Sequence, residues 1–245
     1  TEMAGVKATS ESLLQRALKR PEQVKKVIQM IAQEGLARTA DMVKGRLSAG
    51  LPVGYSAAGV VVAMGEGVDD MQIGQRVACA GAQCAYHAEV IRIPRNLATP
   101  IPEVLAFDEA SSVTLGAIAL QGVRRALPTL GECFVVVGLG ILGQLTVQLL
   151  KANGCRVIGT DLDSTRIDLA MSLGMDIGIN PADGDDILKV LRFTDGFGAD
   201  GVIVTAATPS DSVMSTAFHM CRKKGRVVLV GDVGLNLNRS DFYLK

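Results

Sequence analysis

The sequence of 245 residues contains no tryptophan, and aromatic residues make up only 4% of it. Single-stranded nucleic acid is commonly bound by stacking its bases on aromatic side chains, so this chain offers little for such binding. Its charges are balanced, because 25 Lys and Arg residues stand against 25 Asp and Glu residues. The chain therefore has no overall field that would attract nucleic acid or an acidic membrane, and we expect neither as a partner.

The cysteines exclude two further classes of protein. They number five, and no two of them have the C-x-x-C spacing of a zinc ribbon. An odd number of cysteines also argues against a disulfide scaffold. The first residues lack the basic start and the apolar core of a secretory signal. These features favour a reduced, cytoplasmic protein.

The first half of the chain changes its predicted secondary structure twice. Residues 1–50 carry apolar side chains at helical spacing and predict a helical insert. Short runs rich in β-forming residues follow, and they predict a small antiparallel β unit. These runs lie at residues 59–64, 73–79 and 85–93. Beyond them a helix is predicted from Phe107 to Ala126, with Asp108 as its N-cap.

From residue 132 onwards, strand and helix patterns alternate regularly. Strands are predicted at residues 133–137, 156–160, 176–179, 201–205 and 226–230. Helices are predicted between them, at residues 141–153, 164–173, 185–194 and 210–221. This alternation implies right-handed crossovers and a parallel sheet, so the fold class is α/β. The uncharged stretch 133–150 is nearly long enough to cross a membrane, but its glycines and glutamines favour a buried strand followed by a helix.

The clearest chemical motif is a G-x-G-x-x-G run. It consists of Gly138, Leu139, Gly140, Ile141, Leu142 and Gly143. The run follows a predicted strand and opens a predicted helix, which is the context that a dinucleotide-binding loop requires. The first glycine permits a tight turn, the second lets the backbone approach a pyrophosphate, and the third lets the helix pack on its strand. The helix N-terminus offers free N–H groups to the phosphates. The motif thus predicts a Rossmann, doubly wound parallel sheet with a dinucleotide site.

An acidic residue lies where a ribose-binding group is expected. Asp161 ends the second strand of this region, 18 residues after Gly143. A carboxylate there accepts hydrogen bonds from the ribose hydroxyls and repels a 2′-phosphate, so NAD is favoured over NADP. Leu162 and Arg166 belong to the same predicted cofactor site, and the charge of Arg166 softens that preference. Two plainer interpretations stay open: a doubly wound fold without a dinucleotide, and an Asp161 that only ends a strand in solvent.

These features together resemble the medium-chain dehydrogenases, often described as zinc-binding alcohol dehydrogenases. The stretches that carry the resemblance keep the family order. They are residues 54–67, 74–78, 107–126, 130–150, 154–163, 198–205 and 225–231. The resemblance implies a GroES-like catalytic domain before a Rossmann domain, and hydride transfer between NAD(P) and an alcohol or carbonyl. It also implies that Thr205, Ala206, Val230 and Gly231 border the adenosine and the nicotinamide.

The sequence departs from the family where the catalytic zinc is bound. The family usually has a histidine ligand within Gly-His-Glu, and the matching residues here are Gly54, Tyr55 and Ser56. Thr114 matches a position near the nicotinamide and offers no metal ligand. The four-cysteine structural zinc lobe is absent as well. We therefore expect no zinc and take Tyr55, Ser56 and Thr114 as candidate catalytic residues, with Tyr55 as a proton donor to a carbonyl.

The resemblance also suggests how the chain is organised. We expect a helical insert at residues 1–50, a partial GroES-like domain at 51–130 and a Rossmann NAD-binding domain at 131–245. The chain begins where the family has already passed several strands and ends before a sixth Rossmann strand, so we expect it to be truncated. Its start and residues 52–56 look most like a bacterial bi-domain oxidoreductase subgroup linked to polysaccharide synthesis. That likeness leaves open a further domain or a homo-oligomer.

The sequence therefore predicts a zinc-free, NAD-dependent oxidoreductase that acts on a small-molecule alcohol or carbonyl, with a sugar-related substrate as one option. Two alternatives stay open. One is an NADPH-dependent quinone or enone reductase. The other is a non-catalytic module that binds a dinucleotide without turning over a substrate.

Overall fold

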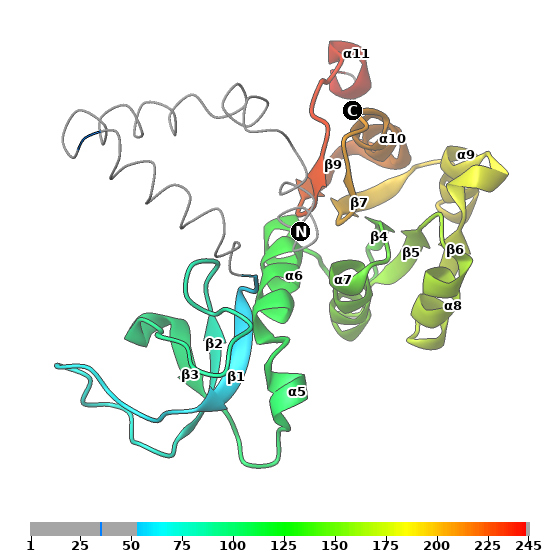
Figure 1. Cartoon of the computed structure of the whole chain (residues 1–245). Helices are drawn as coiled ribbons and strands as arrows, with labels where there is room; N and C mark the ends of the chain where they lie inside the picture. The colour runs from blue at the N-terminus through cyan, green and yellow to red at the C-terminus, as the bar shows by residue number, and fades with distance from the viewer. Residues whose placement is uncertain (1–34, 36–52, 244–245) are drawn as a thin grey trace. The chain divides into compact units, whose positions relative to one another are not determined.

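The computed structural model describes Gly35 and residues 53–243 (Figure 1). The helical insert predicted for residues 1–50 lies outside the described residues, apart from Gly35. The chain divides into two compact units, and the division falls between Ser111 and Ser112. This division groups residues 112–130 with the second unit, whereas the sequence-based limits place them in the first domain. Those limits remain predictions.

The first unit is built on a three-stranded antiparallel sheet with the order β1-β2-β3. Its strands are β1 Ser56–Val60, β2 Arg76–Ala80 and β3 Ala98–Pro100, and a 3-10 turn, Arg95–Leu97, leads into β3. A small apolar core is formed by Met71, Val77, Cys79 and Ala85. The structure thus confirms the small antiparallel β unit.

The individual strands of this unit differ from the prediction. The predicted strand 85–93 is wrong, because the backbone turns there: the N–H groups of Cys84 and Ala85 both donate to the Gly81 carbonyl, at 3.2 and 2.9 Å. Val90 is 75% exposed, although Ile91 and Ile93 of the same run pack against the small core. β3 forms later in the chain and pairs with β2 instead. The other two predicted strands exist, but they are shifted along the chain.

The helix predicted from Phe107 to Ala126 is interrupted. It consists of α5, Phe107–Ala110, and α6, Val113–Ala126. Hydrogen bonds at Ser111 explain the interruption. The Ser111 carbonyl accepts the Ser56 hydroxyl at 2.5 Å, which takes this carbonyl away from a continuous helical ladder.

The start of this helix also differs from the prediction. The N-cap is Ala106 and not Asp108. Glu109 satisfies the free backbone group, because its carboxylate accepts the Ala106 N–H at 3.0 Å. Asp108 instead lies in the first turn, where a negative charge is favoured by the positive end of the helix.

The second unit is a five-stranded parallel sheet with the order β6-β5-β4-β7-β9. Its strands are β4 Cys133–Val137, β5 Arg156–Thr160, β6 Ile177–Ile179, β7 Ala199–Val204 and β9 Cys221–Leu229. The connecting helices are α7 Ile141–Ala152, α8 Ser164–Ser172, α9 Asp186–Phe193 and α10 Ser212–Met220, with a 3-10 turn Pro181–Asp183 before α9. This is the strand order of a Rossmann sheet, which confirms the predicted fold class. The largest shift is at β9, which begins at Cys221 and not at residue 226.

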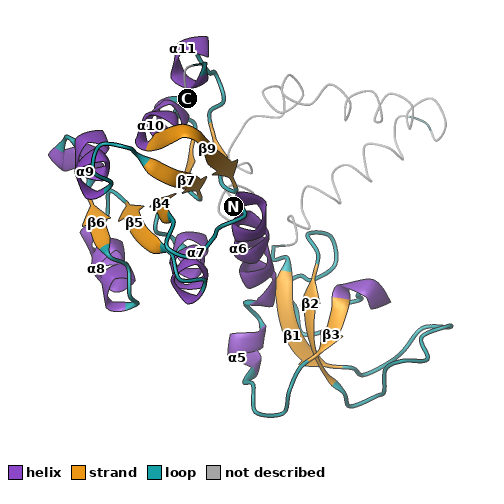
Figure 2. Ribbon diagram, turned by 180° about the vertical axis from the view of Figure 1, so that it is seen from behind, coloured by secondary structure: helices purple, strands orange, loops and turns teal. Residues whose placement is uncertain are grey.

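Helices cover both faces of this sheet (Figure 2). Along β4, Phe134 and Val136 point to the face where they pack with Val147 of α7. Val135 points to the opposite face and packs in the same cluster as Met214 of α10. A central strand that is buried on both faces needs a continuous apolar run, and β4 provides one.

Three short elements follow the main strands and helices of this unit. Past their carboxyl ends, β7 and β9 continue as β8 Ala207–Thr208 and β10 Asp232–Val233, which pair in parallel. α11, Arg239–Phe242, places Phe242 against Phe218 of α10, with ring centres 5.9 Å apart. Elements of two to four residues leave no periodic pattern, which is why the sequence did not predict them.

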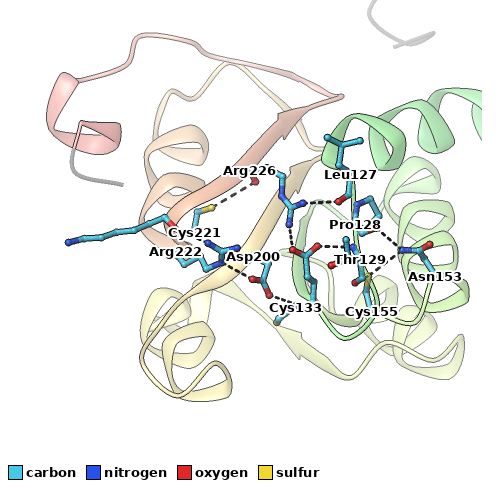
Figure 3. A network of polar contacts seen from close by, with 12 residues as sticks. Leu127, Pro128, Thr129, Cys133, Asn153, Cys155, Asp200, Cys221, Arg222 and Arg226 are labelled. Atoms are coloured by element: carbon cyan, nitrogen blue, oxygen red, sulfur yellow. Dashed lines mark hydrogen bonds and ion pairs between the residues drawn. The ribbon is translucent and has the colours of Figure 1, made fainter.

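A polar network joins the amino ends of three neighbouring strands (Figure 3). The Asp200 carboxylate of β7 accepts the Cys133 N–H of β4 at 2.8 Å and the Arg222 Nε of β9 at 2.6 Å. Arg226 of β9 also pairs with Glu132, next to β4. Burial acts to raise the pKa of Asp200, but these hydrogen bonds and the arginine charges outweigh it and hold that pKa below its usual range. We call these five residues the amino-edge network.

Candidate functional site

The glycine loop connects β4 to α7 at the carboxyl edge of the parallel sheet. Gly138 has a φ of 92°, and a Cβ there would lie 2.7 Å from the Ala206 nitrogen. A Cβ on Gly143 would lie 2.0 Å from the Gly138 carbonyl oxygen. In contrast, a Cβ on Gly140 would have nothing within 4 Å. The outer glycines are therefore required by the fold, while the middle one leaves open space beside the backbone.

This open space adjoins the start of α7. Gly140 is the N-cap, and the helix begins at Ile141. The first N–H groups of a helix have no partner within it and carry its positive end, so an anion can bind there. Among the other predicted loop residues, Leu139 is fully buried, Leu142 is half-buried and Ile141 is exposed.

Asp161 follows β5 and contacts the glycine loop directly. Its Oδ2 accepts the Leu139 N–H at 2.7 Å, and its Oδ1 accepts the Asp163 N–H at 2.9 Å. The side chain is only 10% exposed. A carboxylate has about four acceptor positions, so it can take ribose hydroxyls in addition to these two bonds. The contact with Leu139 was not predicted from the sequence.

Arg166 lies beside this carboxylate. Its Nη1 is 3.6 Å from Asp161 Oδ2 and its Nε is 3.5 Å from Asp163 Oδ2, while its side chain is 54% exposed. Asp163 caps α8 by accepting the Thr165 hydroxyl and N–H, and these hydrogen bonds lower the pKa of Asp163. Leu162, between the two acids, is exposed. The predicted ribose-binding residues therefore do lie together.

Two further pairs of predicted residues lie where β7 and β9 end. The N–H groups of Thr205 and Ala206 both donate to the Val137 carbonyl, at 2.8 and 3.0 Å. The N–H groups of Val230 and Gly231 both donate to the Val204 carbonyl at 2.9 Å. Each strand therefore bends away from the sheet just after these residues. A Cβ on Gly231 would lie 2.0 Å from the Ala206 carbonyl oxygen, so the two bends touch.

Thr205 links these bends to the glycine loop. Its hydroxyl donates to the Gly138 carbonyl at 2.5 Å. The same carbonyl leaves no room for a side chain on Gly143. The structure thus brings the loop, Asp161 and the ends of β7 and β9 to one edge of the sheet, which is where open α/β sheets bind ligands.

Sequence reasoning missed Gln144, the residue that follows the third glycine. Its side chain is buried and its Nε2 donates to two backbone carbonyls, those of Leu139 and Arg166. The sequence did contain a signal for it: Gln144 is a polar residue on the helix turn that the glycine motif predicts to pack closely against a strand.

The candidate catalytic residues are divided between the two units. Tyr55 and Ser56 belong to the first unit, and Thr114 lies in the first turn of α6 in the second. Tyr55 and Thr114 are half-buried, and the Ser56 hydroxyl donates to the Ser111 carbonyl. Their catalytic roles remain predictions.

The residues at the family's histidine-ligand motif do not fit a catalytic zinc. Tyr55 and Ser56 offer hydroxyls there, whereas zinc prefers nitrogen, sulfur and carboxylate ligands. Within residues 53–243, no group of three or more His, Cys, Asp or Glu side chains is arranged to hold a metal ion. In the same part of the chain, no helix is both long enough and apolar enough to cross a bilayer.

Two family models match the chain. The alcohol dehydrogenase GroES-like domain matches residues 27–103, and the zinc-binding dehydrogenase matches residues 142–245. The (R,R)-butanediol dehydrogenase of Neisseria gonorrhoeae (strain ATCC 700825 / FA 1090) is 28% identical over 211 residues, which are 75% of this chain and 59% of that protein. The alcohol dehydrogenase of Geobacillus stearothermophilus is 28% identical over 206 residues, which are 73% of this chain and 60% of that protein.

Solved structures show the same similarity. The 2R,3R-butanediol dehydrogenase of Bacillus subtilis has a TM-score of 0.65 and 25% identity, over 75% of this chain and 60% of that one. The quinone oxidoreductase of Pseudomonas syringae pv. Tomato DC3000 has a TM-score of 0.66 and 25% identity, over 78% of this chain and 59% of that one. The chain thus spans 59% and 60% of the length of the two curated relatives. The two matches, in this order and on this fold, show that the chain belongs to the zinc-binding dehydrogenase family, the medium-chain dehydrogenases.

Proposed function

We propose that this chain supplies the nucleotide-binding part of an oxidoreductase that transfers a hydride between NAD(H) and an alcohol or carbonyl substrate. The observation that carries the proposal is the glycine loop with Asp161 beside it. The open space at Gly140 and the acid that accepts the Leu139 N–H lie at the same edge of one sheet. The names of the two curated relatives, a butanediol and an alcohol dehydrogenase, support this substrate class.

The residues present fit an adenine dinucleotide. The N–H groups at the start of α7 would hold the pyrophosphate next to Gly140. The remaining acceptor positions of Asp161 would take the ribose hydroxyls. The bound dinucleotide supplies the hydride donor or acceptor. NAD is preferred because a 2′-phosphate would stand against the Asp161 carboxylate, and like charges at short distance repel strongly inside a protein.

We also propose that the reaction proceeds without zinc. A carbonyl oxygen that receives a hydride on its carbon must gain a proton, and the Tyr55 hydroxyl is the proposed donor. Because the Ser56 hydroxyl donates its hydrogen to the Ser111 carbonyl, its oxygen can accept a hydrogen bond, which would orient the hydroxyl of Tyr55 or of the substrate. Thr114 is the third proposed hydroxyl and would hydrogen-bond the reacting oxygen.

A paired titration tests this proposal. The purified chain is titrated with NADH and with NADPH while nicotinamide fluorescence is followed, and the absence of tryptophan keeps the protein background low. Tighter binding of NADH supports the role of Asp161 and is followed by turnover assays with alcohols, aldehydes, diols and nucleotide sugars. Binding of neither dinucleotide refutes the proposal. Tight binding without turnover of any of these substrates favours a non-catalytic binding module.

One observation favours a second candidate, an NADPH-dependent quinone or enone reductase. The side chain of Arg166 is 54% exposed and its Nη1 lies 3.6 Å from Asp161 Oδ2, so the guanidinium is placed to meet a 2′-phosphate. A solved relative at 25% identity is a quinone oxidoreductase. Tighter binding of NADPH than of NADH in the same titration would select this candidate.

A further inference from the structure

Gln144 occupies an unusual position for a polar side chain. It lies in the first turn of α7, directly after the glycine loop, and is only 9% exposed. Its Nε2 lies 3.0 Å from the Leu139 carbonyl oxygen and 2.8 Å from the Arg166 carbonyl oxygen. Because both neighbours are acceptors, the amide must present its nitrogen to them.

These hydrogen bonds close a ring of four residues. Leu139 donates its N–H to Asp161 Oδ2 at 2.7 Å, and the same oxygen lies 3.6 Å from Arg166 Nη1. Gln144 completes the ring through the Arg166 and Leu139 carbonyls. We call Leu139, Gln144, Asp161 and Arg166 the anchor ring. The ring connects the glycine loop, which is proposed to bind the pyrophosphate, with Asp161 and Arg166. These two charged groups would distinguish a ribose from a ribose 2′-phosphate.

The other end of the Gln144 amide is energetically unfavourable. Its Oε1 is buried and makes no hydrogen bond within the described part of the chain. A buried polar oxygen without a partner costs free energy that an apolar side chain of the same length would avoid. The two bonds made by Nε2 are therefore the reason to have glutamine here.

We propose that Gln144 is a positioning residue that sets the preference for NAD over NADP. This inference rests on the proposed dinucleotide function. Gln144 holds the first turn of α8 against the glycine loop, and this keeps the Arg166 guanidinium beside Asp161 and Asp163. When that tie is lost, the turn relaxes, Asp161 loses its alignment with the ribose hydroxyls, and Arg166, held less firmly by the two carboxylates, pairs more readily with a 2′-phosphate.

The test compares NADH and NADPH affinities of the wild type and of Gln144→Met, which keeps the length of the side chain and removes both donors. We expect Gln144→Met to weaken NADH binding about tenfold, equivalent to about 1.4 kcal/mol. NADPH binding should weaken by no more than about threefold, because the lost pyrophosphate alignment is partly offset by the released Arg166. The ratio of the two dissociation constants is therefore the readout.

Gln148→Met is the matched control. Gln148 lies one turn later on α7, is exposed, and donates to the Gln144 carbonyl of the same helix, at 3.2 Å. It should leave the affinity ratio unchanged. If Gln144→Met weakens both dinucleotides equally, Gln144 has only a structural role and the inference is overturned.

A measurement on the wild type keeps the inference testable if Gln144→Met does not fold. Exchange of the Gln144 side-chain amide protons, followed by NMR, should slow more in the NADH complex than in the NADPH complex, because only NADH leaves the anchor ring closed. Equal protection in the two complexes would overturn the inference. A wild type that binds neither dinucleotide refutes the proposed function itself, which is a different outcome.

Discussion

Removal of the Asp200 carboxylate should destabilise the second unit more than any surface ion pair can explain. In Asp200→Ala, the N–H of the buried Cys133 loses the partner that it has at 2.8 Å. A buried N–H without a partner costs about 1–3 kcal/mol. The lost pairing with Arg222, whose side chain is partly exposed, adds about 0–1 kcal/mol. The free energy of unfolding should therefore fall by about 1–4 kcal/mol, which lowers Tm by roughly 2–16 °C in a protein of this size.

The assay is urea unfolding followed by far-UV circular dichroism, with hydrogen exchange of the Cys133 amide as a local readout. Asp70→Ala is the matched control, because Asp70 pairs with Arg95 at 2.7 Å but is 64% exposed. The control should lose much less stability, because solvent screens an exposed ion pair. Since the pKa of Asp200 is lowered by folding, its stabilisation is present at neutral pH and is lost as the pH falls below the ordinary range of aspartate, near 4. Equal losses in the two variants, or unchanged exchange at Cys133, would refute this reasoning.

Three other predictions concern a buried thiol, the glycine loop and zinc. Burial raises the pKa of Cys133 to about 11, whereas a thiol in an unfolded chain ionises near pH 8.5. The stability of the fold should therefore fall as the pH rises from about 8.5 to 11. In Cys133→Ala, the midpoint of urea unfolding should fall less over this pH range. Gly143→Ala should lose both NADH binding and thermal stability, because a Cβ at this position has no room. Gly140→Ala should keep its free energy of unfolding within about 1 kcal/mol of the wild type, yet bind NADH about tenfold more weakly. Normal NADH binding by either variant would contradict the loop assignment. Incubation with a chelator, with metal removal checked by metal analysis, should leave turnover unchanged. If turnover is lost and added zinc restores it, the reaction is not zinc-free.

The second unit was largely predictable because its signals are local and regular. The buried strand at Cys133–Val137 is a continuous apolar run, and the glycine run that follows marks the turn into α7. The first unit was less predictable, because single long-range contacts decide its element ends. The bond from the Ser56 hydroxyl to the Ser111 carbonyl spans 55 residues and interrupts a helix whose local pattern is continuous.

The same distinction applies within the candidate site. The positions of Gly138 and Asp161 at one edge of the sheet follow from spacing along the chain, so the motif predicted them. The hydrogen bonds of Gln144 do not, because Leu139 and Arg166 meet its amide only once two βα units pack side by side. An amide that satisfies backbone carbonyls leaves no periodic signal in a single sequence.

The two edges of the parallel sheet have separate tasks. β4 runs from Cys133, which belongs to the amino-edge network, to Val137, which precedes the glycine loop. At about 3.3 Å per residue these ends are roughly 13 Å apart, a separation at which mutational effects on stability generally add without coupling. Substitutions that adapt the loop to another cofactor can therefore be compensated by independent changes at the opposite edge, which makes this unit tolerant of evolutionary and engineered variation in binding.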